Sequence, residues 1–408
     1  MTGTYVIVGA SLGGAKAAET LRAEGFDGPV ILLGEETERP YERPPLSKDY
    51  LLGKADRDTV YVHPADWYAQ HDVDLRLGEA VTAIDPAAHE VTLAGGGRVG
   101  YERLLLTTGS TPRPLPVPGA DLDGVLYLRR LGDSDRLRAA FAAAGRVVVI
   151  GGGWIGLETA AAARAAGAQV TVLEAAELPL LRVLGPEVAQ VFAGLHREHG
   201  VDLRCGVKVA AITGREGRVA GVELSDGSVI DADVVIGAVG ITPNVGLAVA
   251  AGLAEANGIQ VSAALRSSDP DIFAAGDVAS AFHPVLARHL RVEHWANAVN
   301  QPPAAARAML GQKVSYDRMP YFFTDQYDLG MEYSGYVDPG HYETVVFRGD
   351  VPAREFIAFW LGAGGHVLAG MNVNVWDSTE AIQALVRART PVDRRALADP
   401  ATPLTELA

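Results

Sequence analysis

The stretch that decides the fold occurs twice in the chain. It reads YVIVGASLGG at residues 5–14 and VVVIGGGWIG at residues 147–156. In each copy a short apolar run, typical of a buried strand, ends in a glycine turn that opens an Ala-rich segment with helical character. A second apolar run follows each segment, at residues 30–33 and 170–173. This order of strand, turn, helix and strand predicts two Rossmann-type dinucleotide-binding units.

The three key positions of such a turn have separate tasks. The first permits the tight turn, the second lets backbone amides approach a pyrophosphate, and the third lets the helix pack closely on the strand. These positions hold Gly9, Ser11 and Gly14 in the first copy and Gly151, Gly153 and Gly156 in the second. Ser11 stands where the pattern has its second glycine. The departure is mild, because serine is small and its hydroxyl could donate to a phosphate. Each copy therefore predicts a pyrophosphate at the N-terminus of its helix.

An acidic residue follows the second apolar run of each copy. A carboxylate about 20 residues after the turn accepts hydrogen bonds from the adenosine ribose. Glu35 and Glu174 have this place in the first and second copies. Because a carboxylate would repel a 2′-phosphate, Glu174 favours NADH over NADPH. The nearby Arg182 leaves the alternative open.

The composition excludes several classes of protein. A net charge of −15 argues against binding nucleic acid, which is itself a polyanion. The single cysteine, Cys205, cannot form an intramolecular disulfide or hold an iron–sulfur cluster. The histidines between 280 and 300 are too irregularly spaced for a metal site, so none is expected. Lys16 and Glu19 interrupt the first apolar segment early, and no long apolar stretch follows, so we expect a cytoplasmic enzyme.

Two dinucleotide sites in one chain allow a resident flavin and an exchangeable nicotinamide. Three further segments, together with the glycine turns, resemble the FAD-dependent NADH–ferredoxin reductase family of bacterial oxygenase systems. They are RPPLSK at 43–48, FAAGD at 273–277 and EHWAN at 293–297. The first of them is far more specific than the glycine turns. The resemblance extends over essentially the whole chain.

The resemblance implies an α/β, glutathione-reductase-like fold. It has two Rossmann-type dinucleotide-binding domains and a C-terminal α+β domain. Strand–Gly–Pro sequences place the domain crossings near 110 and near 241, and dense aromatics with alternating runs from about 318 predict an antiparallel sheet. The predicted domains are 1–110 (FAD-binding, first part), 111–241 (NAD-binding), 242–317 (FAD-binding, second part) and 318–408 (C-terminal).

The resemblance also implies two catalytic residues. Lys48 would lie beside the flavin N5 and pair with Glu158 on the first helix of the NAD-binding domain. A lysine there would favour the electron-rich reduced flavin, and the carboxylate would offset the cost of burying its charge. The alternatives are that Lys48 is a solvated lysine and Glu158 an exposed helix residue.

Other residues are assigned to the cofactors by the same resemblance. Asp277 would contact the ribityl and pyrophosphate region of FAD, although it could instead be a helix N-cap. Trp295 and Phe323 would flank the isoalloxazine, although both could be core aromatics. The remaining FAD residues are Gly9, Ser11, Gly14, Glu35, Arg43, Val81 and Arg129, the last with its register left open by Arg130. The NAD residues are Gly151, Gly153, Gly156, Glu174 and Arg182.

The leading hypothesis is an NADH–ferredoxin reductase that binds FAD and NADH and passes single electrons to an acidic [2Fe–2S] ferredoxin. Arg288 and Arg291 could bind that partner, or they could be solvated charges. We expect the enzyme to be a monomer or a weak homodimer. A disulfide reductase would need a cysteine near 40–50, where the chain has none. A reductase of a quinone or monodehydroascorbate, and a flavoprotein like apoptosis-inducing factor, stay open as alternatives.

Overall fold

The structure is a computed structural model that describes residues 3–407. Within these residues the chain divides into two compact units. Unit 1 contains the residues up to Arg43, Arg57–Thr111 and Thr242–Arg318. Unit 2 contains Pro44–Asp56, Pro112–Ile241 and the residues from Met319 on. The division into three domains made from the sequence, with the FAD-binding domain in two parts, stays a prediction beside these two units.

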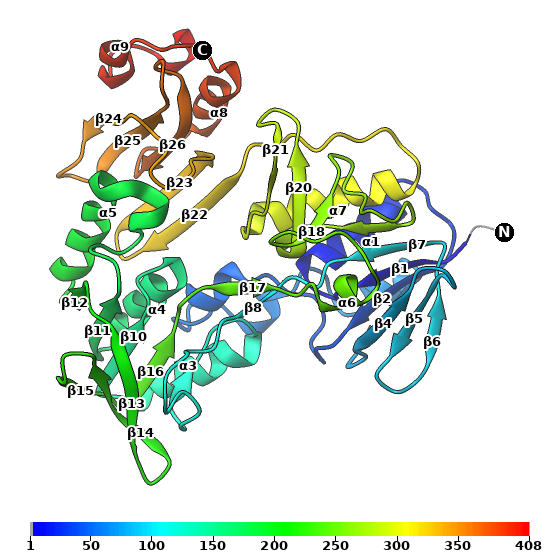
Figure 1. The fold of residues 1–408 in the computed structure, drawn as a ribbon, viewed down its shortest axis with the longest axis horizontal. Helices are drawn as coiled ribbons and strands as arrows, with labels where there is room; N and C mark the ends of the chain where they lie inside the picture. The colour runs from blue at the N-terminus through cyan, green and yellow to red at the C-terminus, as the bar shows by residue number, and fades with distance from the viewer. Residues whose placement is uncertain (1–2, 408) are drawn as a thin grey trace. The chain divides into compact units, whose positions relative to one another are not determined.

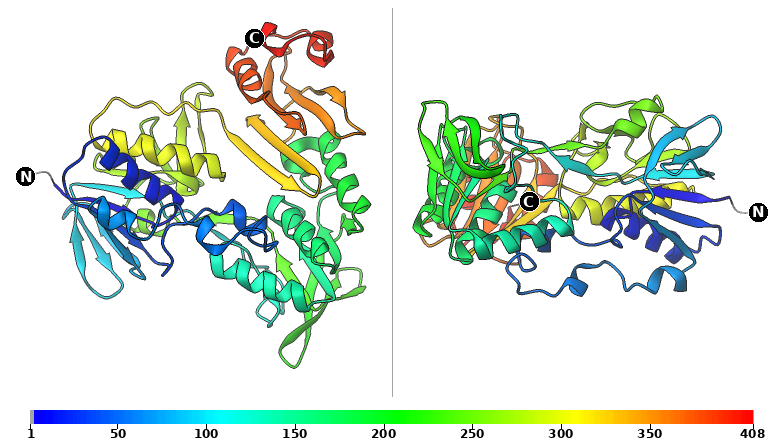
Figure 2. Two further views of the ribbon diagram at one scale, coloured as in Figure 1. Left: turned by 180° about the vertical axis from the view of Figure 1, so that it is seen from behind. Right: turned by 90° about the horizontal axis from the view of Figure 1, so that it is seen from below.

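Unit 1 is built on a five-stranded sheet in the order β19-β7-β1-β2-β3, and every neighbouring pair in it is parallel (Figure 1). Its strands are β1 (Tyr5–Val8), β2 (Val30–Gly34), β3 (Val73–Leu77), β7 (Arg103–Leu106) and β19 (Ile272–Ala274). Val6, Ile7 and Leu105 are fully buried, as expected for a parallel sheet that is covered on both faces. The helices α1 (Leu12–Ala23) and α7 (Trp295–Met309) lie side by side (Figure 2).

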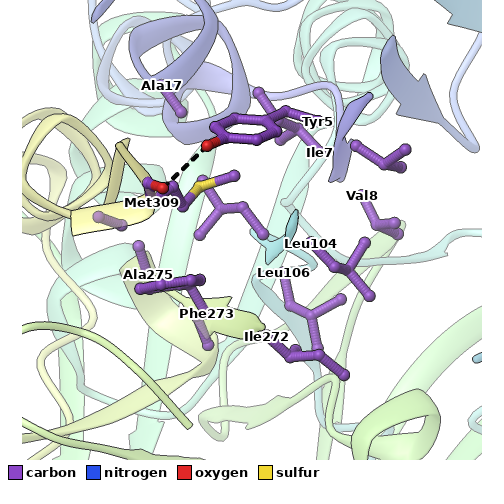
Figure 3. Close-up of a cluster of buried hydrophobic side chains, with 14 of the residues drawn as sticks. Tyr5, Ile7, Val8, Ala17, Leu104, Leu106, Ile272, Phe273, Ala275 and Met309 are labelled. Atoms are coloured by element: carbon purple, nitrogen blue, oxygen red, sulfur yellow. Dashed lines mark hydrogen bonds between the residues drawn. The ribbon is translucent and has the colours of Figure 1, made fainter. Parts of the chain in front are cut away.

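A core of apolar side chains holds the first strand of unit 1 in place (Figure 3). The Tyr5 hydroxyl reaches across this core and donates to the carbonyl oxygen of Met309 at 2.9 Å, which ties β1 to the end of α7. Leu104 and Phe273, on β7 and β19, are fully buried in the same cluster. Each such side chain contributes about 1.5–3 kcal/mol by leaving water. The strand that leads into the first glycine turn is therefore rigidly supported.

Smaller elements complete unit 1. They are two antiparallel or mixed three-stranded sheets and several short helices. The strands are β4 (Val81–Asp85), β5 (Glu90–Leu93), β6 (Arg98–Gly100), β18 (Ile259–Val261), β20 (Ala279–His283) and β21 (Arg288–Leu290). The helices are η2 (Arg57–Val60), α2 (Trp67–Gln70), α6 (Gly246–Ala250) and η3 (Gly276–Val278). The strands β8 (Ser110–Pro112) and β17 (Ile241–Pro243) pair where the chain passes between the units.

Unit 2 repeats the same plan. Its parallel sheet has the order β12-β11-β10-β16-β9, so β10, β11 and β16 correspond to β1, β2 and β7 of unit 1. The strands are β9 (Val125–Leu126), β10 (Arg146–Ile150), β11 (Gln169–Glu174), β12 (Asp202–Cys205) and β16 (Val234–Gly237). The helices are η1 (Pro44–Ser47), α3 (Leu131–Ala143), α4 (Trp154–Ala165) and α5 (Leu181–Glu198), the last kinked at Gly185. A three-stranded antiparallel sheet joins them, with β13 (Val209–Arg215), β14 (Arg218–Leu224) and β15 (Val229–Asp231). The predicted pair of Rossmann-type units is confirmed.

An antiparallel sheet from the C-terminal third also belongs to unit 2, as the alternating pattern after 318 predicted. Its order is β22-β23-β26-β25-β24, and Figure 1 shows its strands in yellow to orange next to α8 and α9. The elements are β22 (Tyr321–Gln326), β23 (Leu329–Gly335), β24 (Thr344–Asp350), β25 (Glu355–Leu361), β26 (Val367–Val373), α8 (Thr379–Ala388), α9 (Arg394–Ala398) and η4 (Leu404–Glu406). Phe322 of β22 packs on Trp154 of α4, with 5.0 Å between ring centroids. The C-terminal sheet therefore rests directly on the helices around the second parallel sheet.

Among residues 3–407, no helix combines the length and the apolar character that crossing a membrane requires.

Candidate cofactor and active site

The first glycine turn, at the end of β1, leaves no room for side chains at two positions. Gly9 has a φ of +119°, and a Cβ there would lie 2.3 Å from the carbonyl oxygen of Thr107. A Cβ on Gly14 would lie 2.2 Å from the oxygen of Gly9. Ser11 has an extended backbone and caps α1 without a side-chain hydrogen bond. The first amides of α1 can therefore bind an anion such as a pyrophosphate.

The second glycine turn, at the end of β10, has the same geometry. Gly151 has a φ of +111°, and a Cβ there would lie 2.3 Å from the oxygen of Ala238. A Cβ on Gly156 would lie 2.0 Å from the oxygen of Gly151. Gly153 differs, because a Cβ there would meet nothing within 4 Å. The protein itself does not require glycine at this position, which suits close approach by a dinucleotide. Both turns fit the cofactors expected from the sequence.

The acid of the second copy is fixed against its turn. The Glu174 carboxylate accepts a hydrogen bond from the Gly152 amide at 2.6 Å and another from the Ala176 amide at 2.7 Å. This position at the carboxyl end of β11 is the one expected for a ribose-binding carboxylate. Arg182 lies exposed on α5, and Glu35 lies exposed just after β2. The roles assigned to these residues stay predictions.

Lys48 and Glu158 form the ion pair that the sequence analysis expected. Lys48 follows η1, where two prolines fix the chain, and Glu158 lies on α4. The Lys48 Nζ lies 2.7 Å from the Glu158 Oε1. The side chains are 16% and 4% exposed, so this pair is shielded from water. The solvated lysine and exposed glutamate considered as alternatives do not match these values.

Two hydroxyl groups complete the surroundings of the Glu158 carboxylate. The Thr324 Oγ1 of β22 donates to the Glu158 Oε1 at 2.5 Å, and the Ser47 Oγ donates to the Oε2. With Lys48, the carboxylate therefore accepts from three donors, which compensate for its loss of water. Neither hydroxyl group was predicted from the sequence to bind Glu158. One signal was present, because Thr324 is a polar residue on the same strand face as the core residue Phe322.

Phe323 lies on the opposite face of β22 and contacts the same lysine. The Lys48 Nζ is 5.4 Å from the centroid of the Phe323 ring, within the range of a cation–π interaction. Burial raises the pKa of the neighbouring Asp325 carboxyl, an effect that Lys48 opposes. Phe323 is half-buried, so its ring is not enclosed in the core.

Asp277 follows β19 at the edge of the sheet where the first glycine turn lies. The Ser110 hydroxyl donates to the Asp277 Oδ2 at 2.9 Å, and the preceding amide, that of Gly276, donates to the Gln301 Oε1 at 3.0 Å. Because β1, β7 and β19 are parallel, their carboxyl ends lie at one edge, which is where such sheets bind nucleotides. Asp277 and Gly9 are therefore at the same edge of unit 1.

Trp295 begins α7 and is oriented by a hydrogen bond. Its Nε1 donates to the Glu42 Oε2 at 2.8 Å, a partner that was not predicted from the sequence. Burial lowers the pKa of the adjacent His294 to about 4, although the Asp277 charge opposes the shift. Arg291 pairs with Glu293, and its side chain is only 8% exposed. Arg291 is therefore not the solvated charge considered as an alternative, whereas Arg288 is exposed, and a docking role for either arginine stays a prediction.

Three further predicted FAD residues have ordinary structural contacts. Arg43 pairs with Glu36 at 3.4 Å. Val81 is half-buried on β4 against the core of unit 1. The Arg129 amide donates to the Asp133 Oδ2 at 3.0 Å just before α3. These contacts do not test a cofactor role, which stays a prediction for all three.

The single cysteine of the chain lies at the end of β12. Cys205 is half-buried, and burial raises the pKa of its thiol. With one thiol, the protein cannot form a disulfide pair that exchanges electrons with a flavin.

The chain is similar to known oxidoreductases in both sequence and structure. The family model described as pyridine nucleotide-disulphide oxidoreductase matches residues 3–302, and a reductase C-terminal model matches residues 321–408. The ferredoxin–NAD(+) reductase component of the anthranilate 1,2-dioxygenase system of Burkholderia cepacia is 42% identical over 97% of both chains. Putidaredoxin reductase of Pseudomonas putida is 38% identical over 98% of this chain and 96% of its own. The covalent putidaredoxin reductase–putidaredoxin complex superposes with a TM-score of 0.95 at 38% identity, covering 99% of this chain and 97% of that one.

Proposed function

The chain belongs to the pyridine nucleotide-disulphide oxidoreductase family, and on that premise we propose that it is an FAD-dependent NAD(P)H–ferredoxin reductase. It takes electrons from NADH and passes them one at a time to a [2Fe–2S] ferredoxin that serves a monooxygenase or dioxygenase. The observation that carries the proposal is the pair of matching glycine turns in a chain with one cysteine. Two dinucleotides can bind, and thiol–disulfide chemistry is not available.

The two turns take different cofactors in this proposal. The turn at Gly9, with Asp277 at the same sheet edge, holds FAD, and the turn at Gly151, with Glu174, binds the exchangeable NADH. Bound FAD supplies the chemistry of accepting two electrons as a hydride and releasing them singly. The protein contributes binding, orientation and charge. Its location in the cytoplasm, where NADH is available, is part of the proposal.

Lys48 and its partners have the clearest chemical task. The Lys48 ammonium is held by Glu158, which two hydroxyls hold in turn. An ammonium fixed in this way stabilises negative charge that develops next to it, and needs no reorganisation when the charge appears. The resemblance to ferredoxin reductases assigns that charge to the flavin. Phe323 covers one side of the same ammonium.

Stopped-flow mixing tests the proposal. The protein loaded with FAD is reduced anaerobically by NADH and then mixed with [2Fe–2S] ferredoxins of the source organism, with a quinone, or with oxygen. We expect at least one ferredoxin to reoxidise the protein more than tenfold faster than oxygen or the quinone. Equally slow reoxidation by every one-electron acceptor would contradict the proposal and favour a flavoprotein with another role. Fastest reoxidation by the quinone would identify a small-molecule reductase.

A further inference from the structure

A chain of buried hydrogen bonds runs through unit 2 and ends at Glu158. The His196 Nε2 lies 2.8 Å from the Gln326 Oε1, and the Gln326 Nε2 donates to the Thr324 Oγ1 at 3.2 Å. The Thr324 Oγ1 donates to the Glu158 Oε1 at 2.5 Å. His196 comes from α5, Thr324 and Gln326 come from β22, and Glu158 comes from α4. All four side chains are buried.

In this chain of hydrogen bonds, only one assignment of donors and acceptors is possible. The ionised Glu158 carboxylate can only accept, so the single proton of the Thr324 hydroxyl must point to it. Thr324 must then accept from Gln326, which turns the amide oxygen of Gln326 toward His196. His196 must therefore carry its proton on Nε2. Burial lowers the pKa of His196 to about 4, so the ring is neutral near pH 7 and can adopt this tautomer. Every donor thus points toward the carboxylate.

This arrangement is not what packing alone favours. Thr324 and Gln326 occupy alternate positions of β22, on the face where Phe322 packs on Trp154. Apolar residues on that face would bury no polar groups, whereas a buried hydroxyl or amide costs free energy unless it is hydrogen-bonded. The bonds that satisfy them converge on the partner of Lys48.

We propose that Thr324, supported by Gln326 and His196, is a positioning residue that fixes Glu158 and, through it, the ammonium of Lys48. The inference rests on the proposed function, because only there does Lys48 act on FAD. Without the Thr324 hydroxyl, the carboxylate loses one of three donors and can turn toward the remaining two. The ammonium would then no longer be held in one place.

The test uses FAD-loaded full-length protein with three variants. Thr324→Val removes the hydroxyl and keeps the branched shape, and Thr324→Ser keeps the hydroxyl. Ser334→Ala is the matched control, because Ser334 is a buried hydroxyl on the adjacent strand β23 that is not part of this chain of bonds. Two quantities are measured, namely the rate of flavin reduction at saturating NADH and the midpoint potential of the bound FAD.

We expect Thr324→Val to slow flavin reduction about tenfold, the scale of one hydrogen bond to a charged group, and to lower the midpoint potential. Thr324→Ser and Ser334→Ala should leave both quantities near those of the unaltered protein. In a Glu158→Gln background, Thr324→Val should add almost nothing, because its effect is transmitted through that carboxylate.

Three results would overturn the inference: unchanged rate and potential in Thr324→Val, a loss that Thr324→Ser fails to restore, or a loss that persists in the Glu158→Gln background. If Thr324→Val does not fold, Gln326→Met removes the donor to Thr324 with little change of shape. We then expect the rate and the potential to change in the same direction by a smaller amount. If both stay the same in Gln326→Met, the inference is overturned. Failure of the proposed function is distinguishable, because the unaltered protein itself would then not reduce any ferredoxin.

Discussion

The two dinucleotide units share a backbone and differ in what they add to it. In both turns the first glycine has a φ above +110°, and a Cβ placed on it would lie 2.3 Å from a backbone carbonyl oxygen. In both turns the third glycine packs against the first. The sheets have the same strand order. The backbone therefore provides the same pyrophosphate site twice, and the side chains make the two sites unequal.

The clearest difference lies at one equivalent position of the two helices. Lys16 and Glu158 each lie seven residues after the first glycine of their turn (16 − 9 and 158 − 151). Lys16 is 28% exposed and pairs with Glu19, one turn away on its own helix. Glu158 is 4% exposed and binds groups from η1 and β22. In unit 1 the residue at this position forms an ion pair within its own helix. In unit 2 the residue at the same position connects η1, α4 and β22. The helix of the second unit therefore also holds Lys48 in place, whereas the helix of the first unit has only the task of binding its dinucleotide.

The largest expected effect comes from paired glycine variants. Gly9→Ala puts a Cβ against the Thr107 carbonyl, and Gly151→Ala does the same against Ala238, both at positive φ. We expect Gly9→Ala to be purified without FAD. Gly151→Ala should keep its yellow colour but bind NADH on the order of 100-fold more weakly, since the amides are displaced. Flavin absorbance and an NADH titration measure both. Loss of FAD from Gly151→Ala alone would reverse the assignment of the two sites.

The second effect concerns the stability that the ion pairs at the two equivalent helix positions contribute, Lys16–Glu19 and Lys48–Glu158. Lys48→Met leaves the Glu158 carboxylate buried beside an apolar side chain, which should cost about 3–5 kcal/mol. Lys16→Met removes a half-exposed pair and should cost less than about 1 kcal/mol. Urea unfolding compares the two variants. The double variant Lys48→Met/Glu158→Gln should recover much of the loss, and equal destabilisation by both lysine variants is not compatible with a shielded pair.

The third effect is a dependence of stability on pH. The folded pKa of His196 is about 4, because burial disfavours its charged form, and it lies below the value of about 6.5 in an unfolded chain. The unfolded state therefore takes up a proton first. The contribution is complete above about pH 6.5 and is lost as the pH falls toward 4, up to about 3 kcal/mol.

His196→Gln keeps a donor for Gln326 and cannot be protonated, so its unfolding free energy should fall less between pH 7 and pH 4.5. His199→Gln, which replaces a partly exposed ring at the residue that follows the same helix, is the control. His294 of unit 1, also with a pKa of about 4, contributes equally to all three proteins and cancels in the comparison. Parallel pH profiles for the two variants would show that His196 is not the group that titrates.

The smallest effect concerns the two acids. Glu174→Ala should reduce the preference for NADH over NADPH in kcat/KM by about tenfold, since repulsion of the 2′-phosphate is lost. Glu35→Ala, in the other unit, should leave this preference unchanged. Steady-state kinetics with both nucleotides measures the ratio. A preference that survives in Glu174→Ala would refute the role given to this carboxylate.

Much of the fold could be predicted from the sequence because it depends on local signals. The glycine turns, the apolar runs around them and the alternating pattern after 318 each act over about ten residues. Lys48 and Glu158 were expected to meet only through a resemblance, since they lie 110 residues apart. Local pattern gave no such link.

The supporting groups could not be predicted for the same reason. His196 and Gln326 are 130 residues apart, and Trp295 and Glu42 are 253 apart. Their contacts arise only when β22 packs on α4 and α5, or when α7 packs in unit 1. Thr324 and Gln326 were visible only as polar residues in an aromatic strand, which could equally have been its exposed face. The burial of Arg291 could not be predicted either, because the sequence does not show that its ion pair with Glu293 leaves the side chain only 8% exposed.

The most direct test compares the equivalent helix positions in catalysis. Flavin reduction by saturating NADH is followed anaerobically in Glu158→Gln and in Lys16→Gln. If Glu158 connects the NADH unit to Lys48, Glu158→Gln should slow the reduction more than about tenfold with little change in NADH affinity, because a neutral amide no longer fixes the ammonium. Lys16→Gln should match the unaltered protein. Equal rates in the two variants would contradict the division of roles between the units.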